Sequence, residues 1–210
     1  MAFGNGISWE NFASEITENT NGNPDRIFFV YGHDKKKDDI IDRIKKYIPF
    51  QYSCGKLLDI GCSIGRWVDI LQKLDMNYYG VDQSDEAIRT AVRYHPKELF
   101  YKTFLWNICF DNEFDLIFCN NVLQHNTLEE KNRILPLLRR ALKKDGLGLL
   151  FINESTVLYD TMTQLTYDGW IKFIESYGFK FIESWQKNDI GLDEAYLFKH
   201  EEGKIDTTKI

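Results

Sequence analysis

The stretch Lys56-Leu57-Leu58-Asp59-Ile60-Gly61-Cys62-Ser63-Ile64-Gly65-Arg66-Trp67 decides the fold of this 210-residue chain. An apolar run ends in an acid, a turn with spaced glycines follows, and apolar residues then recur at helical spacing. This order predicts a buried strand over residues 56–61, a tight turn, and a helix over residues 64–74. Glycine suits such a turn because the main chain adopts φ values that other residues avoid, and because a ligand can approach the backbone closely.

Strands and helices alternate along the rest of the chain, and two strands close it without a helix between them. Further strands are expected at residues 77–82, 99–105, 114–120, 147–153, 180–185 and 194–199. Helices are expected after Ser84, over residues 127–143 and over residues 168–177. The pattern predicts an α/β fold, a three-layer sandwich whose seven-stranded sheet is mostly parallel, with an antiparallel last strand. One domain is expected over residues 1–210, with a short N-terminal helical cap (1–50) and a Rossmann-like core (55–200).

Composition narrows the class of function. The net charge of −6 disfavours nucleic acid as a partner, although a basic cluster such as Lys35 to Lys37 could still form a local patch. The four cysteines include no Cys-x-x-Cys pair, so neither a zinc site nor a redox pair is indicated. No apolar run approaches the roughly 20 residues of a membrane helix, and the first residues do not resemble a secretory signal. We therefore expect a cytoplasmic protein without a membrane partner.

Asp82 ends the second predicted strand, some twenty residues beyond the glycine turn. In open α/β sheets ligands bind outside the carboxyl ends of the strands. An acid at this place suits hydrogen bonds from two ribose hydroxyls. Dinucleotide-binding proteins share the same pairing, so the turn and the acid together do not choose the cofactor.

Five stretches resemble class I S-adenosylmethionine (SAM) methyltransferases, in that family's order. Leu57 to Cys62 resembles the first motif, and Tyr79 to Ser84 resembles the second strand. Phe114 to Ile117 resembles the fourth strand, and Val122 to His125 resembles the loop after it. Leu142 to Leu147 resembles the turn before the fifth strand, and Phe173 to Phe179 resembles the late Gly-Phe turn. An antiparallel last strand is also typical of this family. The resemblance covers roughly residues 55–186 and implies that SAM is the methyl donor and S-adenosylhomocysteine (SAH) the product.

The resemblance also implies roles for single residues. The cofactor-binding residues it implies are Asp59, Gly61, Cys62, Ser63, Gly65, Asp82, Gln83, Trp106, Asn107 and Asn120. Of these, the turn residues would lie along the methionine part of SAM, Asp82 would bind the ribose, and Trp106 with Asn107 would lie near the adenine. Ser63 departs from the family because the middle position of the turn is usually glycine. Asn107 departs as well, because many members place an acid near the adenine.

His125 is the best candidate for a catalytic base, because an imidazole exchanges a proton near neutral pH and this residue follows the fourth strand on the cofactor side. A structural histidine that bonds the loop backbone is the alternative. Substrate-binding residues are expected in the N-terminal segment and in the long loop after the fifth strand. These candidates are Tyr31, His33, Glu154 and Tyr159.

Two sequence features argue against particular subclasses of methyltransferase. Asn120-Asn121-Val122-Leu123 lacks the Pro-Pro-aromatic run of enzymes that methylate amino groups of DNA bases, and Asn120 stands where metal-dependent catechol-type enzymes place an aspartate. We therefore expect metal-free transfer of a methyl group to an oxygen or nitrogen of a small-molecule acceptor, such as a sugar or nucleotide-linked metabolite. An RNA or protein methyltransferase and a non-catalytic SAM-binding partner subunit are the alternatives that the sequence leaves open.

Overall fold

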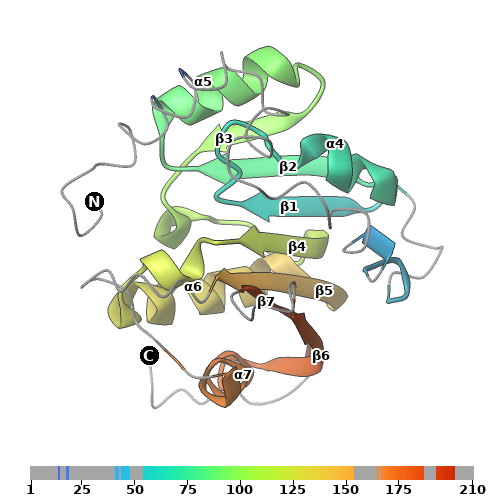
Figure 1. Ribbon diagram of the computed structural model, residues 1–210, viewed down its shortest axis with the longest axis vertical. Coiled ribbons are helices and arrows are strands. Elements are labelled where there is room, and N and C mark those ends of the chain that lie inside the picture. Colours follow the sequence, from blue (N-terminus) through green and yellow to red (C-terminus); the bar gives the residue numbers. More distant parts are fainter. Residues whose placement is uncertain are drawn as a thin grey trace. The chain divides into compact units, whose positions relative to one another are not determined.

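The computed structural model describes residues 14, 18, 41–42, 44–47, 54–153, 165, 167–186 and 193–201. The chain consists of two compact units, Met1–Leu105 and Trp106–Ile210. The strands follow the order β3-β2-β1-β4-β5-β7-β6 in a seven-stranded sheet (Figure 1). Since β7 runs antiparallel to both of its neighbours, the predicted mostly parallel sheet with an antiparallel last strand is confirmed.

Three parallel strands form the sheet part of the first unit. Its elements are β1 (Lys56–Ile60), α4 (Val68–Leu71), the 3-10 helix η3 (Gln72–Leu74), β2 (Asn77–Asp82), α5 (Asp85–Tyr94) and β3 (Leu99–Lys102). β1 pairs with β2 from Lys56↔Asn77 onward, and β2 pairs with β3 from Tyr79↔Leu99 onward. Four consecutive residues of β1 are buried, as expected of a strand covered on both faces. The carboxyl ends of β1 and β2 therefore lie side by side.

The helix after the glycine turn is shorter than the sequence predicts. Residues 64–67 form turns, and α4 begins only at Val68. Gly65 has φ +81°, a left-handed conformation that interrupts the right-handed hydrogen-bond pattern of a helix. The apolar spacing nevertheless predicts the core correctly, because Ile64, Val68 and Leu71 are all buried.

The second unit contains the other four strands. After the 3-10 helix η4 (Leu105–Asn107) at the boundary, its elements are β4 (Phe114–Asn120), the 3-10 helix η5 (Leu123–His125), α6 (Leu128–Ala141), β5 (Leu142–Asn153), α7 (Tyr167–Glu175), β6 (Phe179–Gln186) and β7 (Asp193–His200). All seven residues of β4 are buried, and β5 pairs with it in parallel. β5 begins five residues earlier than predicted, because the register passes from Phe114↔Leu142 to Leu116↔Leu147 and the expected turn becomes a bulge inside the strand.

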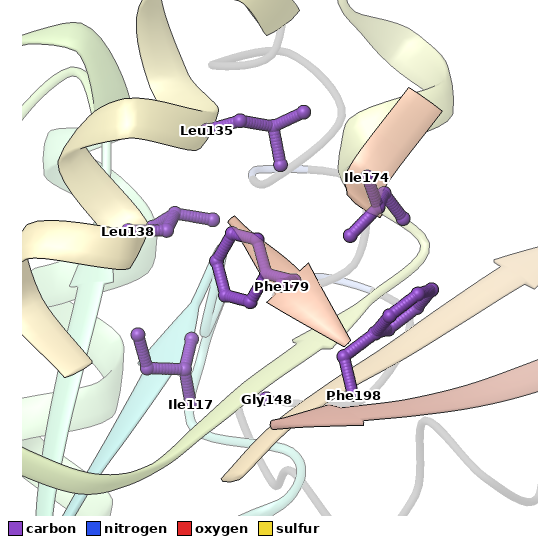
Figure 2. Close-up of a pocket in the computed structure, with 7 residues that line it drawn as sticks. All are labelled: Ile117, Leu135, Leu138, Gly148, Ile174, Phe179 and Phe198. Carbon is purple, nitrogen blue, oxygen red and sulfur yellow. The ribbon is translucent and has the colours of Figure 1, made fainter. Parts of the chain in front are cut away.

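A cavity of about 10 Å³ lies in the core of the second unit (Figure 2). Its lining is wholly apolar and includes Ile117, Leu135, Gly148, Ile174, Phe179 and Phe198. Ligand pockets are usually at least about 300 Å³, so this cavity is a small packing defect in the core.

The predicted N-terminal cap falls mostly outside the described residues. Two of its positions, Ile41 and Ile44, are helical and buried. No helix in the described part of the chain is long and apolar enough to cross a membrane.

Candidate functional site

The turn between β1 and α4 places three residues in the left-handed region. Gly61 has φ +67°, Ser63 has φ +53° and Gly65 has φ +81°. The N–H groups of Gly61 and Cys62 both donate to the Val81 carbonyl, at 2.8 and 3.1 Å. The turn is therefore fastened to the carboxyl end of β2.

The left-handed conformation of Ser63 gives a physical reason why glycine suits this position. A side chain in that region clashes with its own carbonyl oxygen, at a cost of roughly 1–2 kcal/mol. The Ser63 N–H donates to Asp82 Oδ2 at 3.0 Å, and this backbone bond does not depend on the side chain.

Gly65 lies against a histidine that the sequence analysis did not single out. A Cβ at Gly65 would lie 2.8 Å from Cδ2 of His95, closer than real Cβ contacts allow. The His95 side chain is only 10% exposed, and its Nδ1 lies 3.8 Å from Asp69 Oδ1. The turn thus needs glycine at position 65 both for its φ angle and for the space that His95 fills.

Asp82 is held by two backbone donors, one from each side. Oδ2 accepts the Ser63 N–H at 3.0 Å and Oδ1 accepts the Ser84 N–H at 2.9 Å. The Asp82 main chain is fixed as well, because its carbonyl accepts the Thr103 N–H at 2.8 Å. A carboxylate can accept about four hydrogen bonds, so this arrangement is compatible with additional hydroxyl donors.

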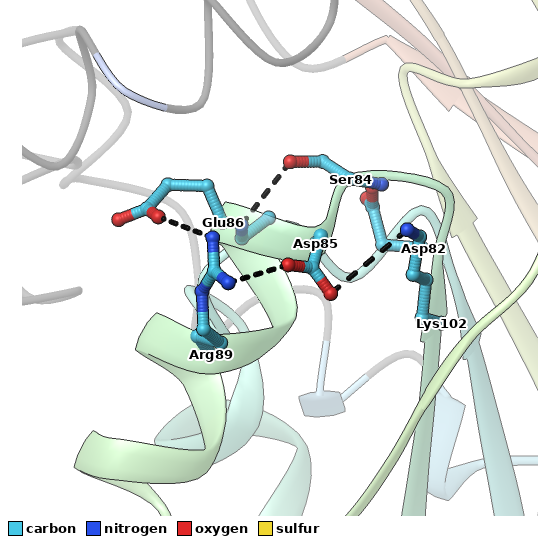
Figure 3. A network of polar contacts seen from close by, with 7 residues as sticks. Asp82, Ser84, Asp85, Glu86, Arg89 and Lys102 are labelled. Atoms are coloured by element: carbon cyan, nitrogen blue, oxygen red, sulfur yellow. Dashed lines mark hydrogen bonds and ion pairs between the residues drawn. The ribbon is translucent and has the colours of Figure 1, made fainter.

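Helix α5 begins directly behind Asp82 (Figure 3). The Ser84 hydroxyl caps it by accepting the Ala87 N–H at 3.1 Å, as predicted. Asp85 forms ion pairs with Arg89 at 2.6 Å and with Lys102 at 3.9 Å. These side chains are largely exposed, so the pairs add little stability, and the cap does most to fix the start of the helix.

Asp59 is a buried acid at the start of the turn. Its Oδ2 accepts the hydroxyl of Tyr78 at 2.5 Å. Burial raises the pKa of Asp59 to about 7, although the Tyr78 hydrogen bond and the charge of Arg66 act in the opposite direction. A cation bound beside Asp59 would favour its charged form, so the acid is suited to a positively charged ligand group.

Cys62 and Gln83 contribute differently to this part of the site. The Cys62 thiol is buried, and burial together with the charges of Asp82 and Asp59 raises its pKa well above the usual value. The thiol is therefore neutral and unsuited to nucleophilic attack. Gln83 is half-buried beside Asp82.

The other predicted cofactor residues belong to the second unit. Trp106 and Asn107 lie in η4, where Trp106 is half-buried and Asn107 is exposed. The guanidinium of Arg133 lies 5.8 Å from the Trp106 ring centroid, within cation–π range. Asn120 is buried at the carboxyl end of β4.

His125 lies in the loop that follows β4. It is half-buried at the end of η5, and its N–H donates to the Val122 carbonyl at 3.0 Å. Nε2 of Gln124 donates to Oδ1 of Asn121 at 3.1 Å, and Asn121 has φ +55°. The loop therefore has a defined backbone conformation, which is a condition for any role of His125 in catalysis.

The four predicted substrate-binding residues, Tyr31, His33, Glu154 and Tyr159, lie outside the described residues. Within the described ranges no three His, Cys, Asp or Glu side chains cluster closely enough to hold a metal ion.

A sequence model described as a methyltransferase domain matches residues 58–147. This range contains the glycine turn, Asp82 and the loop of His125. Residues 58–147 of the chain are therefore similar to a methyltransferase domain, in agreement with the resemblance seen in the sequence. No curated protein sequence matches the chain.

Solved structures share the fold of this chain at low sequence identity. A TehB-like SAM-dependent methyltransferase from Corynebacterium glutamicum is 18% identical with a TM-score of 0.70, over 90% of this chain and 98% of that chain. The magnesium protoporphyrin IX methyltransferase ChlM from Synechocystis, with bound SAM, is 15% identical with a TM-score of 0.68, over 93% and 98%. The PH0226 protein from Pyrococcus horikoshii is 16% identical with a TM-score of 0.68, over 92% and 100%.

The residues of the first unit fit a ligand with ribose hydroxyls and a cationic group, which are features of SAM. The left-handed turn keeps the main chain free of large side chains at positions 61 and 65, so that a ligand can lie against it. Asp82 presents a fixed carboxylate for hydroxyl donors, and Asp59 a buried acid for a cation.

Several residues that shape the candidate site are absent from the sequence-based predictions. Tyr78 and Arg66 act on Asp59, and His95 packs on Gly65. Tyr78 lies opposite Leu57 in the β1–β2 register, which the two strand patterns could have suggested. The sequence carries no signal for His95, because the end of α5 meets the turn only in the folded chain.

Proposed function

We propose that this methyltransferase moves a methyl group from SAM to an oxygen or nitrogen of a small-molecule acceptor, by metal-free in-line displacement in the cytoplasm. A sugar or nucleotide-linked metabolite is the acceptor class that we favour. The observation that carries the assignment of the donor site is the Asp82 carboxylate, held between the Ser63 and Ser84 N–H groups where β2 meets the glycine turn. Two backbone hydrogen bonds already orient this carboxylate, so little further ordering is needed on binding.

Charge and similarity support a small acceptor. The net charge of −6 works against a phosphate backbone, because nucleic-acid binding depends on lysine and arginine contacts to phosphates. By its name, the ChlM relative acts on magnesium protoporphyrin IX, which is a small molecule.

In this proposal the residues divide the work between binding and proton transfer. When bound, SAM supplies a methyl carbon that its sulfonium group activates. The glycine turn and Asp82 hold the donor in place, and the Asp59 carboxylate stabilises a cationic group beside it. His125 takes the proton that leaves the acceptor's hydroxyl or amine as the new bond to carbon forms.

Incubation of the protein with methyl-labelled SAM and fractionated cell extract tests this function. We expect label in the metabolite fraction, and identification of the labelled product names the acceptor. Label confined to the RNA or protein fraction would show a macromolecular acceptor instead, and SAH binding without label in any fraction would show a non-catalytic subunit.

Two variants make the same test specific for the site. Asp82→Ala should abolish both SAH binding in calorimetry and label transfer, because the ribose acceptor is lost. His125→Gln should keep SAH binding and reduce transfer by about 10²-fold or more, as expected for loss of a general base. Absence of any SAH or SAM heat in the wild-type protein would contradict the proposal at its first step.

A further inference from the structure

A lysine is fully buried in the second unit, close to the loop of His125. Lys131 lies in the second turn of α6 with 0% of its surface exposed, and it is among the largest fully buried side chains of the described residues. Lysine is almost never fully buried unless it is paired with an acid. The contacts of this side chain therefore call for an explanation.

Among the described residues, the partners of the Lys131 ammonium are a backbone carbonyl and an aromatic ring. Nζ donates to the backbone carbonyl of Asn126 and lies 5.5 Å from the centroid of the Trp170 ring in α7. Within the described part of the chain, no acid forms an ion pair with it. Burial lowers the pKa of Lys131 to about 8, while the charge of Glu130 acts in the opposite direction.

The carbonyl that accepts from Lys131 belongs to the residue directly after His125. The Asn126 N–H donates to the Leu123 carbonyl at 3.1 Å, and its side chain donates to the Val122 carbonyl at 2.8 Å. Asn126 thus ties both ends of η5 together. The bond from Lys131 to its carbonyl adds the connection between this loop and the interior of the unit.

The other contact of Lys131 connects the loop with α7. Trp170 is buried, and the turn directly after α7 also contacts α6, since the Tyr177 hydroxyl donates to Oδ1 of Asn132 at 2.7 Å. In the sequence, α7 follows the segment that contains the predicted acceptor residues Glu154 and Tyr159.

We propose that Lys131 is a positioning residue, whose buried ammonium fixes the backbone of the His125 loop through the Asn126 carbonyl and couples this loop to α7. The proposal rests on the proposed function only in that His125 is assigned a catalytic role there. Replacing buried charges by apolar side chains of similar size is often neutral or stabilising. A stability role therefore does not account for this ammonium, whereas the placement of one loop does.

The Lys131→Met variant tests the proposal, because methionine replaces the apolar stem of lysine but has no group that can donate a hydrogen bond. Lys172→Met, which changes an exposed lysine of α7, is the matched control. We expect Lys131→Met to resist urea at least as well as the wild-type protein. At the same time, amide exchange at His125 and Asn126 should rise by about tenfold or more, with no change in α6, and the control should show neither effect.

A titration of the wild-type protein keeps the test independent of whether the variant folds. The imidazole resonance of His125, assigned with His125→Gln, should show an inflection near pH 8, where Lys131 loses its proton. Where Lys131→Met folds, its spectrum should lack this inflection.

Two results would overturn the proposal. They are a wild-type His125 resonance without that inflection, and a Lys131→Met protein that loses stability while exchange in the loop follows global unfolding. None of these measurements requires SAM or an acceptor, so failure of this proposal is distinguishable from failure of the proposed function.

Discussion

Replacing Gly65 with alanine tests whether the left-handed turn makes the donor site. At φ +81° an alanine would be strained by roughly 1–2 kcal/mol. Its Cβ would also lie 2.8 Å from Cδ2 of His95 and 3.4 Å from Val68, and such overpacking costs typically about 1–3 kcal/mol. We expect the free energy of unfolding of Gly65→Ala to fall by about 2–5 kcal/mol.

Gly148→Ala is the matched control, because the same change should have the opposite sign there. Gly148 has no positive φ, lies inside β5, and borders the small cavity in Figure 2. A Cβ would meet Phe179 Cε1 at 3.8 Å, an ordinary contact. Relative to glycine, alanine stabilises a strand by about 0.5–1 kcal/mol, and the buried methyl adds about 0.8 kcal/mol, so we expect a gain of roughly 1–2 kcal/mol.

Urea unfolding and calorimetry with SAH measure both consequences. Gly65→Ala should lose stability and SAH affinity together, because the strained residue is part of the turn that holds the ligand. Gly148→Ala should gain stability and keep the wild-type affinity. In Gly65→Ala/His95→Ala the two changes should be non-additive by about 1–3 kcal/mol, since removing the imidazole relieves the overpacking but not the φ strain.

The reasoning would be refuted by a Gly65→Ala protein with wild-type stability and wild-type affinity for SAH. Strict additivity of the double variant would show that His95 does not press on the turn. Loss of stability in Gly148→Ala would show that a Cβ is also harmful at a buried glycine without a positive φ. The loss in Gly65→Ala could then not be attributed to its φ angle and its contact with His95.

Three further predictions concern charged groups of the described residues. The pKa of Asp59 is raised to about 7 from 3.8, so the folded state holds a proton that the unfolded chain releases. The stability that this group contributes is fully present below pH 4 and should fall by at most about 4 kcal/mol as the pH rises through 7. Urea unfolding at pH 5 and pH 8 should show this loss in the wild-type protein and not in Asp59→Asn. Asp82→Asn should weaken SAH binding by about 10- to 100-fold in calorimetry, because an amide nitrogen that can only donate replaces one charged acceptor oxygen. Ser84→Ala should lower the free energy of unfolding by about 1 kcal/mol, because the helix loses its cap. It should keep the affinity for SAH, because the backbone N–H that binds Asp82 remains. Lys143 donates to both oxygens of the buried Asp115, at 2.9 and 2.8 Å. Lys143→Met leaves this carboxylate without its partner, so the free energy of unfolding should fall by about 1–3 kcal/mol. Adding Asp115→Asn removes the charge and should restore part of the lost stability in thermal unfolding.

The limits of two strands could be predicted closely because local residue patterns mark both of their ends, whereas β3 ends at Lys102, earlier than the predicted residue 105. The limits of β2 and β4 agree with the predicted ranges, since a short run of apolar and aromatic residues between turn residues is typical of a buried strand. The start of α6 was predictable for a similar reason: Thr127 and Glu130 form the capping box that their spacing indicates.

Local pattern failed where backbone conformation departs from the regular period. The apolar spacing from Ile64 onward predicts a helix, but the left-handed Gly65 delays its start to Val68. Likewise, Asp145-Gly146 reads as a turn, yet pairing with β4 absorbs these residues as a bulge in β5. In the second case, pairing with a neighbouring strand outweighs the preference of the segment itself.

By itself, the sequence determined the order of strands and helices, the glycine turn, and the acid that follows it at Asp82. These features are encoded within a few residues each, so spacing and residue type suffice to read them. Only the tertiary structure decided that Asp82 is held between Ser63 and Ser84, that burial shifts the pKa of Asp59, and that His95 fills the space beside Gly65. Likewise, nothing in the sequence near Lys131 shows that its ammonium is enclosed beneath the loop of His125. Burial and contact between segments distant in the sequence arise only when the chain packs, and these set the electrostatics and the shape of the site.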